Sequence, residues 1–123
     1  LDSNLSLITV GSSDYNDNKS YFSNIGKCVD LFAPGSNILS AWIDGVDVAQ
    51  LQSGTSMAAP YVTGVVAKYL EKYPKATPNQ VYDFIISSSI KDKIGDLEDY
   101  ADTPNRLLYG LVELPKRKKL PEP

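Results

Sequence analysis

A change in the spacing of apolar residues constrains the fold more than any other feature of this sequence. After residue 55, apolar side chains recur at i, i+3, i+4, i+7, i+8 and i+11: Val62, Val65, Val66, Tyr69, Leu70 and Tyr73. This spacing predicts a helix over Ser56–Lys72. Residues 57–67 carry no charge, and a helix that is apolar on every side is a buried helix. The chain must therefore contribute to a core that surrounds this helix.

Two residues inside the predicted helix are poor helix formers. Gly64 lowers helix stability, so its presence favours a position where close packing requires a small residue. Pro60 falls within about the first turn, where a missing N–H is tolerated. Both positions are compatible with a tightly packed helix.

Segments with the composition of β-strands precede the helix. Short, β-branched runs between turn-forming residues predict strands at residues 5–10, 29–32, 38–43 and 46–52. The last two strands meet at Asp44-Gly45, a dipeptide typical of a tight hairpin turn. Residues 12–20 are rich in Asn, Asp and Ser and are predicted to form a polar loop.

A second helix is predicted after the first. Thr77 has the position of an N-cap, Pro78 that of the first helical residue and Gln80 that of the third. Residues 91–106 are charged and loop-like, and residues 107–112 predict a last strand. Strands followed by two helices indicate an α/β layered protein.

Composition limits both size and chemistry. The 123 residues, 42% of them hydrophobic, suffice for one domain with a modest core, and no apolar run is long enough for a membrane span. The chain contains no His. It therefore has no Ser–His or Cys–His nucleophile of its own, no imidazole metal ligand and no unshifted proton shuttle near neutral pH.

The net charge of −3 is unevenly distributed. Four of the twelve basic residues lie in the tail at positions 116–119, so residues 1–115 hold 8 basic and 14 acidic residues. An acidic body argues against a nucleic-acid surface. The basic tail has two interpretations, a patch that binds nucleic acid and a solvated terminal extension.

The single cysteine, Cys28, cannot form an internal disulfide. No acid–base partner is close to it in the sequence, so we expect a buried structural thiol rather than a reactive one.

Chemistry is concentrated in the segment Ser53-Gly54-Thr55-Ser56-Met57-Ala58-Ala59-Pro60. It places a serine where a glycine-bearing turn meets the start of the buried helix. The first N–H groups of a helix have no partner within it and favour negative charge, so a nucleophile here has an oxyanion donor in its own backbone. The alternative is an ordinary N-cap, the commonest role of Ser or Thr before a helix.

The sequence around this serine resembles that of a known family. GTSMAAPYVTG is similar to GTSMAxPHVAG, the nucleophile signature of the subtilisin-like serine proteases (subtilases). The order of four further segments is typical of the proteinase K branch: ITVGSSD, YFSNIGKCVDLFAPG, NILSAWI and LQSGTSMAAP. Three short stretches resemble the fungal cerevisin group in particular: YFSN, GKCVD and DTPN. The resemblance covers most of residues 7–112.

The resemblance implies a fold and a set of roles. The fold is the three-layer subtilisin-like α/β fold with a mostly parallel sheet, of which residues 1–114 would form the C-terminal part and residues 115–123 a tail. Ser56 would be the catalytic serine of a serine endopeptidase, in the nucleophile turn formed by Gly54, Thr55 and Ser56. The triad Asp and His and the oxyanion Asn would come from sequence upstream, so we expect these 123 residues alone to be inactive.

Two departures from the family pattern lie just after the serine. Tyr61 replaces the usual His, which is a packing residue, and Thr63 replaces the usual Ala. They give weak support to a second hypothesis, a subtilase-derived module that has lost catalysis and serves a structural or interaction role. The intact nucleophile motif favours the protease.

The resemblance also implies ligands, partners and a location. Asp30 corresponds to a calcium-ligating carboxylate, with the carbonyls near Leu5 and Leu7 as partners; the alternative is a carboxylate that caps or pairs at a strand end. The chemistry itself requires no cofactor. The expected partners are a polypeptide substrate, the N-terminal remainder of the domain and a propeptide. A secretory route to a vacuole, the cell wall or the medium fits the relatives and the glycosylation sequons at Asn4 and Asn18.

Overall fold

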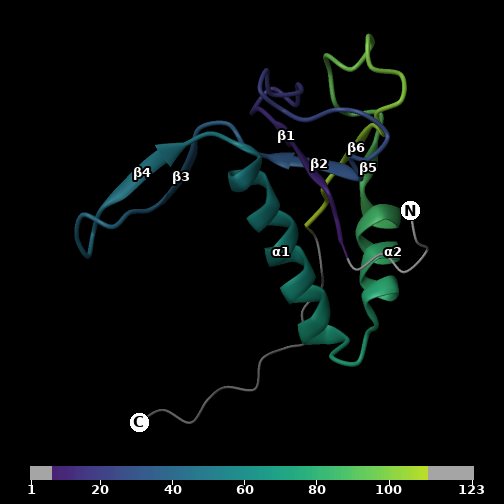
Figure 1. Cartoon of the computed structure of the whole chain (residues 1–123). Coiled ribbons are helices and arrows are strands. Elements are labelled where there is room, and N and C mark those ends of the chain that lie inside the picture. Colours follow the sequence, from purple (N-terminus) through teal and green to yellow (C-terminus); the bar gives the residue numbers. More distant parts are fainter. Residues whose placement is uncertain (1–6, 111–123) are drawn as a thin grey trace.

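The computed structural model describes residues 7–110, which form a small mixed sheet, a separate hairpin and two helices (Figure 1). The elements in chain order are β1 (Val10–Ser13), β2 (Leu31–Pro34), β3 (Ile38–Ala41), β4 (Ala49–Gln52), α1 (Thr55–Lys72), α2 (Pro78–Ser88), β5 (Ile90–Lys91) and β6 (Arg106–Leu107).

The main sheet has the strand order β1-β2-β6-β5. β1 pairs with β2 and β2 with β6 in parallel, while β5 and β6 are antiparallel. Helix α1 packs against β1 and β2, and α2 packs against α1. The predicted α/β class with a mostly parallel sheet is confirmed.

The first strand was predicted in the wrong place. Residues 7–9 are not in a strand, residues 5 and 6 lie outside the described part, and β1 instead runs through the small residues Gly11, Ser12 and Ser13. Packing explains the shift, because a Cβ on Gly11 would lie 2.6 Å from Cε1 of Phe32 on the paired strand. Strand propensity favours residues 5–10, but only small side chains fit beside that ring.

Strand β2 separates two groups of core residues. Leu31 and Ala33 belong to the larger cluster, which includes Val62 and Val65 of α1, whereas Phe32 packs with Ile94 in the smaller cluster. Successive side chains of a strand point to opposite faces of a sheet, which accounts for this division. The strand runs over Leu31–Pro34, two residues later at each end than the predicted 29–32.

The predicted hairpin is confirmed, with shorter strands and a longer connection. β3 and β4 pair antiparallel from Ile38↔Gln52 to Ala41↔Ala49, and the N–H of Trp42 donates to the carbonyl of Val48 at 2.8 Å. The hairpin extends away from the main sheet (Figure 1).

Helix α1 confirms the predicted segment but is buried on one face only. Ala58, Val62 and Val65 are buried, whereas 45% of Tyr61 is exposed. Gly64 is also exposed, and a Cβ there would meet nothing within 4 Å among the described residues, so the close packing expected at this glycine is not seen there.

Pro60 lies deeper in the helix than predicted. It is the sixth residue of α1 rather than part of the first turn. An N–H at this position would bond to the carbonyl of Ser56, so proline leaves that carbonyl without its i+4 partner.

The predicted start of α2 is confirmed in detail. The N–H of Gln80 donates to Oγ1 of Thr77 at 3.3 Å, and the N–H of Thr77 donates to Oε1 of Gln80 at 2.9 Å. This reciprocal pair is a capping box, with Pro78 at the start of the helix.

The capping box gives a first prediction. Thr77→Ala removes one acceptor from the helix start, so we expect it to lower the free energy of unfolding by about 1 kcal/mol. Denaturant titration measures the loss. Ser87→Ala, on the exposed side of the same helix, should change the value by less than about 0.5 kcal/mol. Equal losses for the two variants would show that the box does not stabilise α2.

The segment after α2 contains two short strands. Residues 91–106 were predicted to be loop, but β5 and β6 occupy its two ends. The strand predicted at 107–112 begins one residue early and ends at Leu107; residues 111 and 112, and the predicted tail at 115–123, lie outside the described residues.

The expectation of a buried Cys28 is wrong. Cys28 is exposed, because it lies in a turn after Gly26, whose φ of 105° is in the left-handed region that favours glycine. The next residue, Val29, is the one that turns inward and is 2% exposed. Of the helices in residues 7–110, none has the length and apolarity that crossing a membrane requires.

Candidate active site

The turn before α1 requires a glycine. Gly54 is the N-cap residue of α1, with φ 156° and ψ 163°, a conformation that other residues rarely adopt. Its N–H donates to the carbonyl of Gly35 at 2.8 Å, and its carbonyl accepts from the N–H of Met57 at 3.0 Å. The turn is therefore fixed by backbone bonds on both sides.

Ser56 is the second residue of α1 and its side chain is exposed. The cap position belongs to Gly54, and no side chain makes a capping hydrogen bond to this helix start. The alternative in which the serine serves as an N-cap is therefore wrong. The hydroxyl lies beside the first N–H groups of an 18-residue helix, where the helix dipole favours negative charge.

The turn is tied to the carboxyl ends of β1 and β2. The N–H of Gly35, just after β2, donates to the carbonyl of Ser13, the last residue of β1, at 3.0 Å. The N–H of Asn37 donates to Oγ of Ser53 at 2.9 Å. In parallel α/β sheets, ligands bind outside the carboxyl ends of the strands. Ser56 occupies such a position.

A network of serines beneath the turn was not foreseen from the sequence. Oγ of Ser12 and Oγ of Ser20 are 2.8 Å apart, and Oγ of Ser20 and Oγ of Ser36 are 2.7 Å apart. The N–H of Ser12 donates to Oγ of Ser23 at 2.8 Å. Residues 12–20 were predicted to form a polar loop, yet Ser12 belongs to β1, and Ser12 and Ser20 are buried and link this region to the segment that precedes β3.

Ser56 opens into a groove of about 660 Å³ between the hairpin and α1. We call it the hairpin groove; its lining includes Leu39, Trp42, Ser56, Met57, Pro60 and Tyr61. The hairpin contributes large exposed side chains to this groove, with Leu39 67% and Trp42 38% exposed. Such an exposed apolar surface is typical of a region that another polypeptide covers.

Asp30 lies apart from this groove, in a set of protein hydrogen bonds. Its Oδ2 accepts from the N–H of Thr9 at 2.7 Å and its Oδ1 from the hydroxyl of Tyr82 at 2.9 Å. Nη1 of Arg106 donates to its backbone carbonyl at 3.1 Å. Leu5, one of the predicted calcium partners, lies outside the described residues.

The environment of Asp30 raises the pKa of Tyr82 above 10.0. Burial is the largest cause; the hydrogen bond to Asp30 and the negative charges of Asp30 and Asp83 act in the same direction, while Arg106 opposes them. The folded state therefore holds this proton more tightly than the unfolded state. Stability from the tyrosine is fully present below pH 10 and is lost as the pH rises through the raised pKa.

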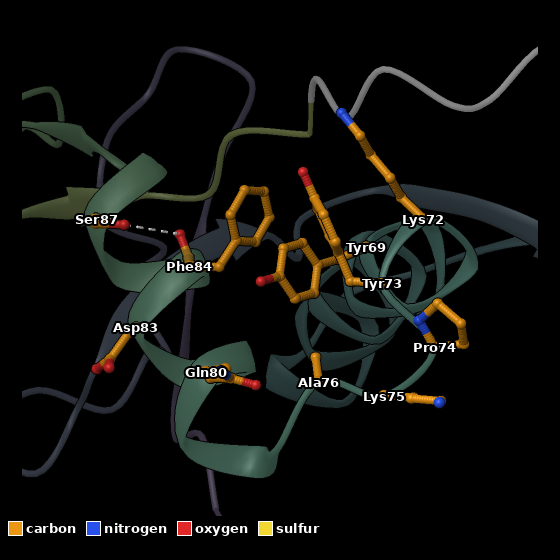
Figure 2. Close-up of a pocket in the computed structure, with 10 residues that line it drawn as sticks. All are labelled: Tyr69, Lys72, Tyr73, Pro74, Lys75, Ala76, Gln80, Asp83, Phe84 and Ser87. Carbon is orange, nitrogen blue, oxygen red and sulfur yellow. Dashed lines mark hydrogen bonds between the residues drawn. The ribbon is translucent and has the colours of Figure 1, made fainter.

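A second pocket of about 660 Å³ lies at the opposite end of α1 (Figure 2). The rings of Tyr69 and Phe84 stack there at a centroid distance of 4.2 Å, and Tyr73 stands 5.0 Å from Tyr69. Because a helix rises about 1.5 Å per residue, this pocket is roughly 20–25 Å from Ser56 and belongs to a different surface. In residues 7–110, acidic, Cys and His side chains do not gather in threes that could hold a metal ion.

Comparison with known proteins identifies the family. The family model described as "Subtilase family" matches residues 3–111. The chain is similar to cerevisin of Saccharomyces cerevisiae, with 44% identity over 84% of this chain and 18% of cerevisin. It is also similar to the extracellular serine proteinase of a Thermus species, with 45% identity over 83% of this chain and 24% of that protein.

A solved structure shows the same fold. The cold-adapted subtilisin-like serine proteinase superposes with a TM-score of 0.80 and 47% identity, covering 88% of this chain and 38% of that structure. The chain thus spans less than half the length of the proteins it matches. The predicted subtilisin-like fold and the likeness to the cerevisin group are confirmed, and the chain belongs to the subtilase family.

Proposed function

We propose that the protein is a serine endopeptidase in which Ser56 is the nucleophile. The observation that carries this proposal is the position of Ser56: it is exposed in the first turn of α1, it borders the hairpin groove, and the capping role belongs to Gly54. Membership of the subtilase family supports the same chemistry.

In the proposed reaction, Oγ of Ser56 attacks the carbonyl carbon of a substrate peptide bond. A histidine outside this chain takes the hydroxyl proton and later gives it to the leaving amine, because no residue among these 123 is a histidine. The backbone N–H of Ser56, at the positive end of α1, donates to the developing oxyanion, and an asparagine outside this chain is the second donor. Water then hydrolyses the acyl-enzyme and restores the serine. These steps use protein groups and need no cofactor.

The remainder of the catalytic domain is the first partner that this function requires. Two features support a large covering surface: β1 is the end strand of the described sheet, and the apolar side chains of the hairpin and α1 are exposed. If upstream strands and helices pack against the exposed apolar side chains of the hairpin and α1, they would bring the His and Asp close to Ser56.

The other parts of the proposal follow the family. The substrate is a polypeptide, and a propeptide is a further partner. A secretory route is supported by the name of the Thermus relative, an extracellular proteinase. Residues 1–114 form the C-terminal part of the catalytic domain, and residues 115–123 a basic tail.

Labelling with a fluorophosphonate tests the function. We expect the full-length protein to be labelled at Ser56, because the upstream His makes the hydroxyl nucleophilic. The 123-residue chain alone should show neither labelling nor peptidase activity above background. Mass spectrometry of the labelled peptide identifies the site.

Two outcomes contradict the proposal. Rapid, stoichiometric labelling of the 123-residue chain would show that Ser56 needs no upstream histidine. A folded full-length protein that resists labelling would favour the non-catalytic module, for which Tyr61 in the hairpin groove is the supporting departure from the family pattern.

A further inference from the structure

We propose that Asp30 is a metal-independent tie between α2 and the β1–β2 pair, with its carboxylate satisfied by protein donors rather than by calcium. The expectation of a calcium ligand came from the family resemblance. The contacts of Asp30 in this chain point to a different role.

Both carboxylate oxygens of Asp30 already have donors. The N–H of Thr9 is 2.7 Å from Oδ2, and the hydroxyl of Tyr82 is 2.9 Å from Oδ1. A calcium ion takes six to eight oxygen ligands, often with a carboxylate that binds through both oxygens. To bind both oxygens of Asp30, the ion would compete with these two hydrogen bonds.

A positive charge is also present beside Asp30. Nη1 of Arg106 is 3.1 Å from the backbone carbonyl of Asp30, so this carbonyl too has a protein donor. The guanidinium is always protonated and would repel a divalent cation close by. The residues described around Asp30 therefore do not fit a calcium site.

The same contacts connect segments that are far apart in the sequence. Asp30 and Thr9 form a reciprocal pair, because the N–H of Asp30 also donates to the carbonyl of Thr9 at 2.9 Å. This pair lies directly before the Val10↔Leu31 register of β1 and β2. Tyr82 adds α2 to the pair, and Arg106 adds the start of β6. The tie thus fixes the amino ends of the two strands whose carboxyl ends hold the Ser56 turn.

Thermal unfolding of the full-length protein, inactivated with a serine-protease inhibitor, tests this role. Asp30→Asn, Tyr82→Phe and the double variant are compared with the parent in excess calcium and in excess chelator. We expect Tyr82→Phe to lower the unfolding midpoint by about 2–4 °C, as loss of one partly buried hydrogen bond predicts. Asp30→Asn should lower it by at least as much. Each loss should be the same in calcium and in chelator, and the double variant should lose less than the sum of the two.

The controls separate the tie from a general effect of substitution. Tyr21→Phe, at a tyrosine that is 94% exposed, should leave the midpoint unchanged. A calcium ion elsewhere in the protein would shift the parent and every variant alike. If Asp30→Asn lowers the midpoint in calcium but not in chelator, Asp30 is a calcium ligand and the proposal is wrong. The proposal is also wrong if Tyr82→Phe, like Tyr21→Phe, leaves the unfolding midpoint unchanged. This comparison still decides the question if Asp30→Asn does not fold.

Discussion

Ser56→Ala in the full-length protein is expected to abolish peptidase activity while leaving substrate binding nearly intact. The hydroxyl is the group that forms the acyl-enzyme, so its loss removes the covalent pathway altogether. In subtilisin, a member of the same family, loss of the nucleophile lowers kcat by about 10⁶-fold, and we expect a fall of that order here. Hydrolysis of a chromogenic peptide measures kcat. The affinity of a non-covalent competitive inhibitor shows whether the variant still binds ligands in the substrate cleft.

The matched control for this experiment is Ser87→Ala. Ser87 is exposed on α2 and does not line the hairpin groove that Ser56 borders, so its loss should leave kcat and KM unchanged. If Ser56→Ala retains more than about a hundredth of the parent kcat, another nucleophile carries the reaction and the role assigned to Ser56 is wrong, since residual catalysis without the nucleophile is small.

Gly35→Ala is expected to produce the largest effect away from the nucleophile itself. A Cβ at this buried position would lie 2.7 Å from the carbonyl oxygen of Gly54 and would collide with Oγ of Ser12. Because Gly54 forms the turn before Ser56, relief of the overlap must move either the turn or the buried serine network. We expect a loss of about 1–3 kcal/mol in the free energy of unfolding from overpacking.

The same substitution should also lower kcat/KM by about 10²-fold, as a displacement of about 1 Å at a reacting group can do. Gly110→Ala is the control, because a Cβ there would make only an ordinary contact of 3.5 Å with Cγ2 of Val65. Denaturant titration and peptide hydrolysis on the same samples separate the two losses. A Gly35→Ala protein with parent stability and parent kcat/KM would show that the turn is not held by this contact.

Local chemistry explains what the sequence predicted well. The helix over residues 56–72 has a strong period of 3.6, and the start of α2 carries three capping residues whose hydrogen bonds are made within four positions of the chain. The glycine turn before α1 was also predictable, because Gly54 and Ser56 lie in a continuous and specific motif. Each of these features depends on neighbours in the sequence.

The features that were missed depend on distant partners. β1 lies at Val10–Ser13, where Gly11 packs beside Phe32, and β5 and β6 are two-residue strands that exist only as partners in the sheet. The tie from Tyr82 to Asp30 joins residues 52 positions apart. No local pattern of apolarity or charge signals such contacts, so a single sequence gives little warning of them.

The place of β6 in the sheet has a consequence for the order of folding. β6 comes last among the described strands, yet it lies between β2 and β5, with Phe32 opposite Leu107. The four-stranded sheet therefore cannot be completed until nearly all of residues 7–110 have left the ribosome. Contacts between residues so distant in sequence form slowly, whereas the helices and the hairpin form from local contacts. We expect α1, α2 and the hairpin to form first. Until β6 is added, the edge of β2 that later pairs with β6 is unpaired, and an intermediate with such an edge is a target for chaperones.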